Sequence, residues 1–291
     1  MENPIFDASK LEPFLLADTA DKNTVTGILS VLGHRAKRYL GQHFLVSERV
    51  RDHIVSLVSR HASSVCVEIG GGLGALSIGL AKACDKLLVV EKDKLLAEWL
   101  KMYLSRFSNT EVLHNDFFAL DLEQKASGKV LLVGNIPYYI SGQLVRFMCA
   151  NHYLLCGAVL TVQKEVAGKI TGKAGKLGIP AIAVAAIGNA RYVKTLSEDV
   201  FYPVPQVESA IIEIEIASKP RIEAPSDFVD FVAKVMRYRR KQISNALSFA
   251  GITQSNQVKQ MLSNLGIEPG VRAEELNIDQ WIALARAFNL C

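Results

Sequence analysis

The chain contains a glycine-rich segment, Glu68-Ile-Gly-Gly-Gly-Leu-Gly74, directly after a short apolar run. Glycines at positions 70, 72 and 74 let the backbone approach a ligand closely, because no Cβ atom intrudes. Dinucleotide-binding turns space their last two glycines as G-x-x-G, whereas this segment has G-x-G-x-G. S-adenosylmethionine has no pyrophosphate to seat at the following helix, so the spacing favours this methyl donor over NAD. A tight strand–helix turn without a ligand is the alternative.

Acidic side chains follow the next two apolar runs. Glu91 lies about twenty residues after Gly70, the spacing at which a carboxylate accepts hydrogen bonds from both hydroxyls of a ribose. Asp116 comes after the next run and could accept from the exocyclic amine of adenine, although an Asp in this position also commonly caps the following turn. We therefore predict that Gly70, Gly72, Glu91 and Asp116 bind the cofactor.

A third motif, Asn135-Ile-Pro-Tyr138, has the residue types needed to methylate an amine. The exocyclic nitrogen of adenine is a poor nucleophile, because its lone pair is conjugated into the ring. The Asn135 side-chain oxygen and the backbone carbonyl before Pro137 can turn this nitrogen toward tetrahedral geometry, and the Tyr138 ring can stack on a flipped base. Since Asn is no general base near neutral pH, the predicted chemistry is alignment for in-line displacement. A proline turn with a core tyrosine is the alternative.

These residues must be positioned by alternating strands and helices. Short runs rich in Val, Leu and Ile have the length of buried parallel strands, and segments of helical periodicity separate them. The predicted strands are Val65–Ile69, Leu87–Glu91, Val112–His114, Val130–Gly134 and Ala158–Val162, followed later by Ser209–Ile216 as a strand of the edge type. This pattern predicts an α/β fold with a doubly wound, Rossmann-like parallel sheet, whose ligands bind at the carboxyl ends of the strands.

Helices are predicted both around the sheet and after it. Ser47 is typical of the N-cap of a helix that reaches Val58, and Leu95, Trp99 and Tyr103 share one helical face. After residue 217 we predict only helices, which form a small C-terminal all-helical domain: Ser226 to about Ala250, Asn256–Leu265 and Asp279–Phe288.

The first helix of this C-terminal part carries a cluster of basic residues without an acidic neighbour: Lys234, Arg237, Arg239, Arg240 and Lys241. Because its apolar positions must point into the small domain, part of the basic set faces outward. We predict that Arg237, Arg239, Arg240 and Lys241 contact RNA phosphates. A solvated helix face without a ligand is the alternative.

Composition and charge narrow the class of protein. The 291 residues carry 33 Lys and Arg against 29 Asp and Glu, and this net charge of +4 permits an anionic partner. Five cysteines without a C-x-x-C pair and six scattered histidines predict neither a disulfide scaffold nor a metal site. The acidic N-terminus does not resemble a signal peptide, and no apolar run is long enough for a bilayer. We expect a monomeric cytoplasmic protein with no membrane contact.

With these motifs in hand, the chain resembles the ribosomal RNA adenine dimethyltransferase family of the KsgA type, from about Arg35 onward. The resemblance rests on four further segments: Lys37–Leu45 with the sequence KRYLGQHFL, Phe201-x-Pro-x-Pro-x-Val-x-Ser209, Arg239-Arg-Lys241 and Arg272-Ala-Glu-Glu-Leu276. It implies that His43 and Leu45 line the cofactor site, as do Gly70, Glu91, Asp116 and Asn135. It also implies that Phe201 is a second stacking surface for the target base.

The resemblance implies a reaction and a domain organisation. The reaction is S-adenosylmethionine-dependent dimethylation of two adjacent adenosines in a hairpin loop near the 3′ end of 16S rRNA, with a role in biogenesis of the small ribosomal subunit. The domains are an N-terminal extension (1–34), a methyltransferase domain (35–217) and a helical RNA- or ribosome-binding domain (218–291). Two positions depart from the family pattern: Gly71 stands where Pro is usual, and Leu177-Gly-Ile-Pro180 replaces Y-G-x-L-S. The role of residues 1–34 is not assigned.

Three other functions compete with this expectation. Antibiotic-resistance methyltransferases act on large-subunit rRNA with similar motifs, but their glycine segment commonly has a basic residue where this chain has Leu73. A non-catalytic ribosome assembly factor would use the fold only to bind RNA, and the intact Asn135, Pro137 and Tyr138 argue against it. An NAD oxidoreductase is disfavoured by the glycine spacing and by the absence of a candidate proton donor near the predicted site.

Overall fold

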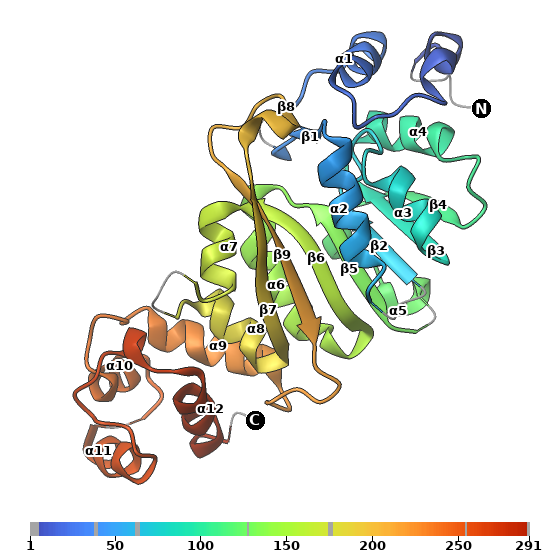
Figure 1. Ribbon diagram of the computed structural model, residues 1–291. Helices are drawn as coiled ribbons and strands as arrows, with labels where there is room; N and C mark the ends of the chain where they lie inside the picture. The colour runs from blue at the N-terminus through green and yellow to red at the C-terminus, as the bar shows by residue number, and fades with distance from the viewer. Residues whose placement is uncertain are drawn as a thin grey trace. The chain divides into compact units, whose positions relative to one another are not determined.

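The computed structural model describes residues 6–37, 40–61, 65–126, 128–173, 177–253 and 255–289, without the side chains of Tyr138 and residues 255–257. Its central element is a seven-stranded sheet in the order β4-β3-β2-β5-β6-β9-β7 (Figure 1). The strands are β2 (Val65–Ile69), β3 (Lys86–Glu91), β4 (Thr110–His114), β5 (Val130–Asn135), β6 (Leu155–Gln163), β7 (Gly188–Leu196) and β9 (Ser209–Ile216). A separate pair consists of β1 (Phe44–Leu45) and β8 (Phe201–Tyr202).

Strands β2 to β6 are parallel, and their order reverses beside β2. Strands β3 and β4 follow on one side of β2, whereas β5 and β6 lie on its other side. Every residue of Val65–Ile69 is buried, because helices cover both faces of such a sheet. Ligands of doubly wound sheets bind at the carboxyl ends of the strands where the order reverses, which here is the end of β2 and β5. The prediction of a doubly wound, Rossmann-like α/β fold is confirmed.

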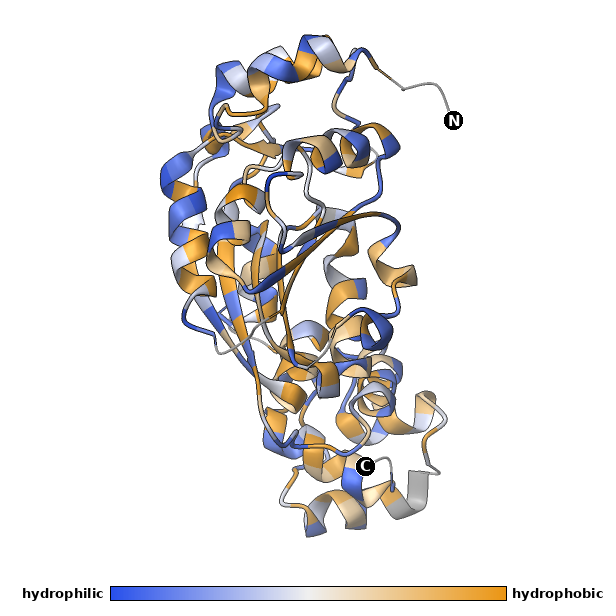
Figure 2. Cartoon of the chain, turned by 90° about the vertical axis from the view of Figure 1, so that its right-hand side faces the viewer, coloured by the Kyte–Doolittle hydropathy of each residue, from blue (hydrophilic) through white to orange (hydrophobic). Residues whose placement is uncertain are grey.

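Figure 2 shows that helices of the protein have hydrophilic and hydrophobic faces. They are α1 (Lys22–Val31), α2 (Glu48–Val58), α3 (Ser77–Ala83), α4 (Lys94–Tyr103), α5 (Leu122–Lys125), α6 (Ser141–Ala150), α7 (Lys164–Ile170), α8 (Ile179–Ile187), α9 (Pro225–Met236), α10 (Ile243–Phe249), α11 (Ser255–Asn264) and α12 (Ile278–Ala287). The Ser47 hydroxyl accepts from the Val50 N–H at 3.4 Å, as predicted for the cap of α2. Within the described residues, no helix has the length and apolar character needed to cross a membrane.

Strand β9 is an internal strand, so its prediction as an edge strand was wrong. The prediction rested on Glu213 and Glu215, since charged side chains are typical of edges. In the structure β9 lies between β6 and β7, and Glu213 is buried. The His61 Nε2 donates to Glu213 Oε1 at 2.9 Å, which compensates the burial of this carboxylate. The edge is formed by β7, which the sequence analysis missed, and there Arg191 and Lys194 are exposed.

The predicted helix from Ser226 to about Ala250 is in fact two helices, α9 and α10. Residues 237–242 between them form turns, because their backbone pairs with a segment about thirty residues later in the chain. The Ile243 N–H donates to the Val271 carbonyl at 2.7 Å, and the Glu274 N–H donates to the Arg239 carbonyl at 3.2 Å. Such distant partners leave no signal in the local periodicity, and this explains the error.

The chain divides into two compact units, and each has its own hydrophobic core. The first comprises Met1–Ser141, Tyr153–Lys164 and Val193–Glu213, and the second Gly142–His152, Glu165–Tyr192 and Ile214–Cys291. In the first unit, side chains of α1 to α4 join those of the strands. In the second, α8, α9, α10 and α12 share a core around Phe228 and Trp281. The domain boundaries at residues 34 and 217 stay predictions.

Candidate active site

The glycine segment forms a turn from β2 toward α3. Gly70, Gly72 and Gly74 have φ angles of +76°, +56° and +94°, in the left-handed region that favours glycine. A Cβ at Gly70 would meet nothing within 4 Å, so the backbone there is open to a ligand. A Cβ at Gly74 would lie 2.9 Å from the Tyr103 ring, so this glycine serves packing. The turn therefore combines an open side at Gly70 with a tightly packed side at Gly74.

The departure from the family pattern at Gly71 has a local explanation. A Cβ at this position would collide with Val89 Cγ1 and would lie 2.9 Å from Leu100 Cδ1. Both side chains are buried, in β3 and α4 respectively. In this chain, therefore, Val89 and Leu100 occupy the space that a proline ring at position 71 would need, and the glycine matches them.

Glu91, at the end of β3, connects the glycine turn to this neighbouring strand through hydrogen bonds. Its Oε2 accepts from the Gly72 N–H at 2.9 Å, and its Oε1 accepts from the Asp93 N–H at 2.8 Å. The residue is only 6% exposed, and this burial raises its pKa, while the two N–H groups act in the opposite direction. Each carboxylate oxygen keeps a second lone pair for a further donor.

Asp116 lies at the same end of the sheet and has two partners. Its Oδ1 accepts from the Phe118 N–H at 3.0 Å, which caps the short helix η3 (Phe117–Ala119), and its Oδ2 accepts from Lys92 Nζ at 2.7 Å. The bond with Lys92 lowers the pKa of Asp116. The capping role that the sequence analysis left open is therefore present. The neighbouring Asn115 N–H donates to the Glu91 carbonyl at 3.1 Å, which brings Asp116 to the edge beside Glu91.

Three segments that are distant in sequence meet at His43. The Asn135 Nδ2 donates to the His43 carbonyl at 2.8 Å, and His43 Nδ1 donates to the Pro203 carbonyl at 2.6 Å. The strands on either side of these contacts, β1 and β8, pair antiparallel, with Leu45 opposite Phe201. The sequence-predicted residues 43, 45, 135 and 201 are therefore joined by direct contacts or strand pairing.

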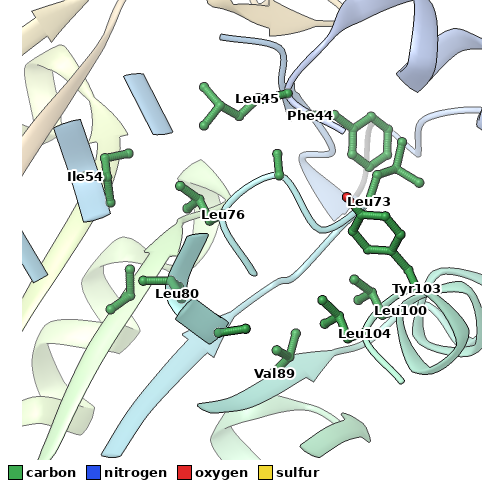
Figure 3. Packing of buried hydrophobic residues seen from close by; sticks show 14 of the residues in the cluster. Phe44, Leu45, Ile54, Leu73, Leu76, Leu80, Val89, Leu100, Tyr103 and Leu104 are labelled. Carbon is green, nitrogen blue, oxygen red and sulfur yellow. The ribbon is translucent and has the colours of Figure 1, made fainter. Parts of the chain in front are cut away.

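The same region reaches the glycine turn through Phe44. A Cβ at Gly72 would lie 3.2 Å from Phe44 Cδ1, so β1 lies against the turn (Figure 3). Phe201 is only 2% exposed, and its role as a stacking surface stays a prediction. Pro137 follows β5 and is half-buried. Tyr138 lies directly after it, and its side chain falls outside the described residues.

The four predicted RNA contacts, Arg237, Arg239, Arg240 and Lys241, lie in the turns between α9 and α10 of the second unit. All four are exposed, although they do not lie on a helix face as expected. The Arg239 Nε lies 3.9 Å from Glu274 Oε2, a long contact that leaves the guanidinium largely hydrated. The exposed position of this basic cluster agrees with contact to an anionic partner.

Asp93 is a site residue that the sequence analysis missed. Its Oδ2 accepts from His34 Nε2 at 3.0 Å and from Lys37 Nζ at 2.7 Å, and its Oδ1 caps α4. Although burial opposes ionisation, these two donors hold the pKa of Asp93 well below its usual range. The sequence signal was an ordinary N-cap pattern before Lys94, which does not reveal the partners 56 and 59 residues earlier in the chain.

Comparison with known proteins identifies the family. The model of the ribosomal RNA adenine dimethylase family matches residues 33–290. The chain belongs to this family. It is 32% identical over 263 residues to ribosomal RNA small subunit methyltransferase A of Dehalococcoides mccartyi (strain CBDB1), which covers 88% of this chain and 90% of that relative. The protein of the same name from Bacillus mycoides (strain KBAB4) is 32% identical over 288 residues, with coverage of 94% and 99%.

Solved structures agree on the fold of this rRNA adenine dimethylase. A dimethyladenosine transferase from Plasmodium falciparum superposes with a TM-score of 0.73 at 20% identity, covering 85% of this chain and 98% of that chain. A 23S rRNA methyltransferase superposes with a TM-score of 0.66 at 23% identity, covering 84% and 99%. These structures support the Rossmann-like fold. The family match and the named relatives show that the protein is an rRNA-modifying methyltransferase, so the predicted family is confirmed.

Proposed function

We propose that this enzyme uses S-adenosylmethionine to dimethylate the exocyclic amines of two adjacent adenosines in a hairpin loop near the 3′ end of 16S rRNA. The observation that carries the proposal is the bond from Asn135 Nδ2 to the His43 carbonyl. Because the amide N–H is donated within the protein, the side-chain oxygen is the end that accepts from an adenine amine. The names of the curated relatives favour the small subunit over the large one.

The residues around the glycine turn fit the proposed cofactor. The open backbone at Gly70 admits a ligand, and the Glu91 carboxylate lies beside it at Gly72. When bound, S-adenosylmethionine supplies a methyl group on a positively charged sulfur. We assign Glu91 to its ribose hydroxyls and Asp116 to its adenine amine, with the remaining contacts from His43, Leu45, Gly70, Gly72 and Asn135.

The proposed chemistry at the target base is alignment. In the first methyl transfer, the Asn135 Oδ1 and the Ile136 carbonyl accept the two N–H groups of the amine, so that its lone pair turns out of conjugation. The Ile136 N–H donates to the Thr161 carbonyl at 2.9 Å, and Pro137 has no N–H, so this peptide is held in place. Tyr138 and Phe201 stack on the flipped base, and the amine proton leaves to water after methyl transfer.

We assign substrate binding to the basic cluster Arg237, Arg239, Arg240 and Lys241, and catalysis to residues 35–217. The substrate is 16S rRNA in an assembling small subunit, and the enzyme acts as a monomer in the cytoplasm.

The function is tested by mass spectrometry of rRNA from cells that lack the protein. We expect dimethyladenosine to be absent at two adjacent positions near the 3′ end of 16S rRNA. The parent protein restores it, whereas Asn135→Ala does not, because the amine loses an acceptor. Asn151→Ala is the matched control, since Asn151 also donates its amide N–H to a backbone carbonyl, that of Phe147. Near-normal turnover of purified, folded Asn135→Ala contradicts the alignment mechanism.

The cofactor assignment is tested at Glu91. Glu91→Ala removes the ribose acceptor, so we expect S-adenosylmethionine to bind about tenfold more weakly or worse in calorimetry, a loss of about 1.4 kcal/mol or more. Glu98→Ala, on the exposed face of α4 where Glu98 pairs with Lys101, serves as the control. Unchanged affinity in Glu91→Ala, or tighter binding of NAD than of the methyl donor, contradicts the assignment.

A further inference from the structure

Residues 6–34 form an N-terminal segment that we call the N-terminal brace. It comprises the short helix η1 (Ala8–Phe14), helix α1 and the residues up to His34, and it lies almost wholly before residue 33, where the family match begins. Leu11, Val25 and Ile28 are fully buried in the core of the first unit. The brace is therefore a packed part of this unit.

The brace holds the C-terminal end of α4. The Tyr103 hydroxyl donates to the Ala17 carbonyl at 2.9 Å and accepts from Thr19 Oγ1 at 3.4 Å. Beyond the helix, Arg106 Nη1 donates to the Leu15 carbonyl at 2.8 Å. The residues joined by these bonds are 84 to 91 positions apart in the chain. Figure 1 shows the brace alongside α4.

The brace also holds the N-terminal end of α4. His34 Nε2 donates to Asp93 Oδ2 at 3.0 Å, and both side chains are buried. The Asp93 N–H donates to Glu91, whose other oxygen accepts from the Gly72 N–H at 2.9 Å. A continuous series of hydrogen bonds therefore runs from His34 to the glycine turn.

Helix α4 in turn packs against the glycine turn. Trp99 Nε1 donates to the Leu73 carbonyl at 3.1 Å, and the Tyr103 ring stacks on Trp99 with centroids 5.1 Å apart. The Tyr103 ring also fills the space beside Gly74, where a Cβ would lie only 2.9 Å from the ring. Figure 3 shows this ring next to Leu73. Residues 72, 73 and 74 are thus each contacted by groups that the brace holds in place.

We propose that the N-terminal brace orders the glycine turn for the cofactor, with Tyr103 and Asp93 as positioning residues. The proposal rests on the proposed function, because it takes the ligand of the turn to be S-adenosylmethionine. A turn with three residues at positive φ has many alternative conformations when it is not held. Ordering it before the ligand arrives reduces the entropy lost on binding and so raises affinity.

The test uses Tyr103→Phe and Thr19→Val, which remove hydroxyl contacts between the brace and α4 but keep the packing. Thr26→Val is the matched control, since the Thr26 hydroxyl donates within α1 to the Asn23 carbonyl. Amide hydrogen exchange of residues 70–76 is measured in the cofactor-free protein, and calorimetry gives the affinity for S-adenosylmethionine. We expect exchange about three- to tenfold faster and binding about three- to tenfold weaker in Tyr103→Phe. Thr19→Val shifts both in the same direction, and Thr26→Val matches the parent.

Two outcomes overturn the proposal. One is parental exchange in residues 70–76 together with parental affinity in both variants. The other is exchange that rises equally in β2 and β5, because this indicates a general loss of stability without a specific effect on the turn. If the parent itself fails to bind S-adenosylmethionine, the proposed cofactor is wrong, while the exchange measurement still decides whether the brace orders the turn.

Discussion

Two buried carboxyl groups lie near the carboxyl ends of β2 and β3, and they differ in their hydrogen-bond partners. Glu91 receives a backbone N–H on each oxygen. Glu68, two residues before Gly70, is 1% exposed, and its Oε2 has no hydrogen-bond partner among the described residues. Burial raises the pKa of Glu68 to about 8, and the nearby charge of Glu91 adds to this effect. Glu68 is therefore largely protonated at neutral pH.

This protonation predicts the pH dependence of stability. Above about pH 4.5 the unfolded chain releases the Glu68 proton, whereas the folded chain keeps it up to about pH 8. The free energy of unfolding therefore falls as the pH rises through this window and is level above it. Glu68→Gln removes this contribution, so urea denaturation should show a flatter pH profile. The variant should also gain on the order of a few kcal/mol over the parent at pH 8.5 relative to pH 5.

The control for this prediction is Glu98→Gln, because Glu98 lies on the exposed face of α4. It should keep the slope of the parent. Parallel profiles for the parent and Glu68→Gln would mean that Glu68 is ionised in the folded state.

At the scale of elements, the glycine turn depends on contacts as well as on backbone freedom. Gly74 needs both a positive φ of +94° and room for the Tyr103 ring, whereas Gly266, after α11, has a φ of +67° and open space around it. Gly266→Ala should cost about 1 to 2 kcal/mol from backbone strain alone. Gly74→Ala should cost about 2 to 5 kcal/mol, because overpacking against Tyr103 adds to the strain. Chemical denaturation of both variants gives the comparison, and equal losses would exclude a packing role for Gly74.

The elements also show what a sequence can predict. The bounds of β2 and β9 are as predicted, because runs of apolar residues define buried strands locally. The turns at 237–242 and the contacts of Asp93 and Tyr103 were not predicted, because their partners are tens of residues away. The placement of Glu91 and Asn135 at one edge followed from strand ends meeting there, whereas the family resemblance supplied His43. The hydrogen bonds that these side chains form with backbone groups could not be predicted from the sequence and are seen only in the structure.

At the scale of the whole molecule, a net charge of +4 is small, so the placement of charge matters more than its total. Replacing Arg239, Arg240 and Lys241 by Gln should weaken RNA binding and flatten its log–log salt dependence by up to about two to three units, because fewer counterions are released. Affinity for S-adenosylmethionine should not change. Filter-binding titrations across salt concentrations measure both the affinity and the slope.

The control variant loses three positive charges outside the basic cluster. Lys82, Lys94 and Lys101 are exposed lysines of α3 and α4, and their replacement by Gln should leave the slope of the parent. If the two triple variants have the same RNA affinity and the same salt slope, the basic cluster contributes only net charge, and the assigned RNA contacts are wrong.

The two units are interleaved along the chain, and this limits how the gene can be recombined. Ile182 and Ala186 of α8 belong to the same hydrophobic core as Phe228 and Trp281, although the segment Val193–Glu213 of the first unit comes between them in sequence. A cassette that starts at residue 218 would carry Phe228 without the helix that covers it. Chimeras between relatives should therefore retain a native core only when residues 165–192 and 214–291 come from the same parent.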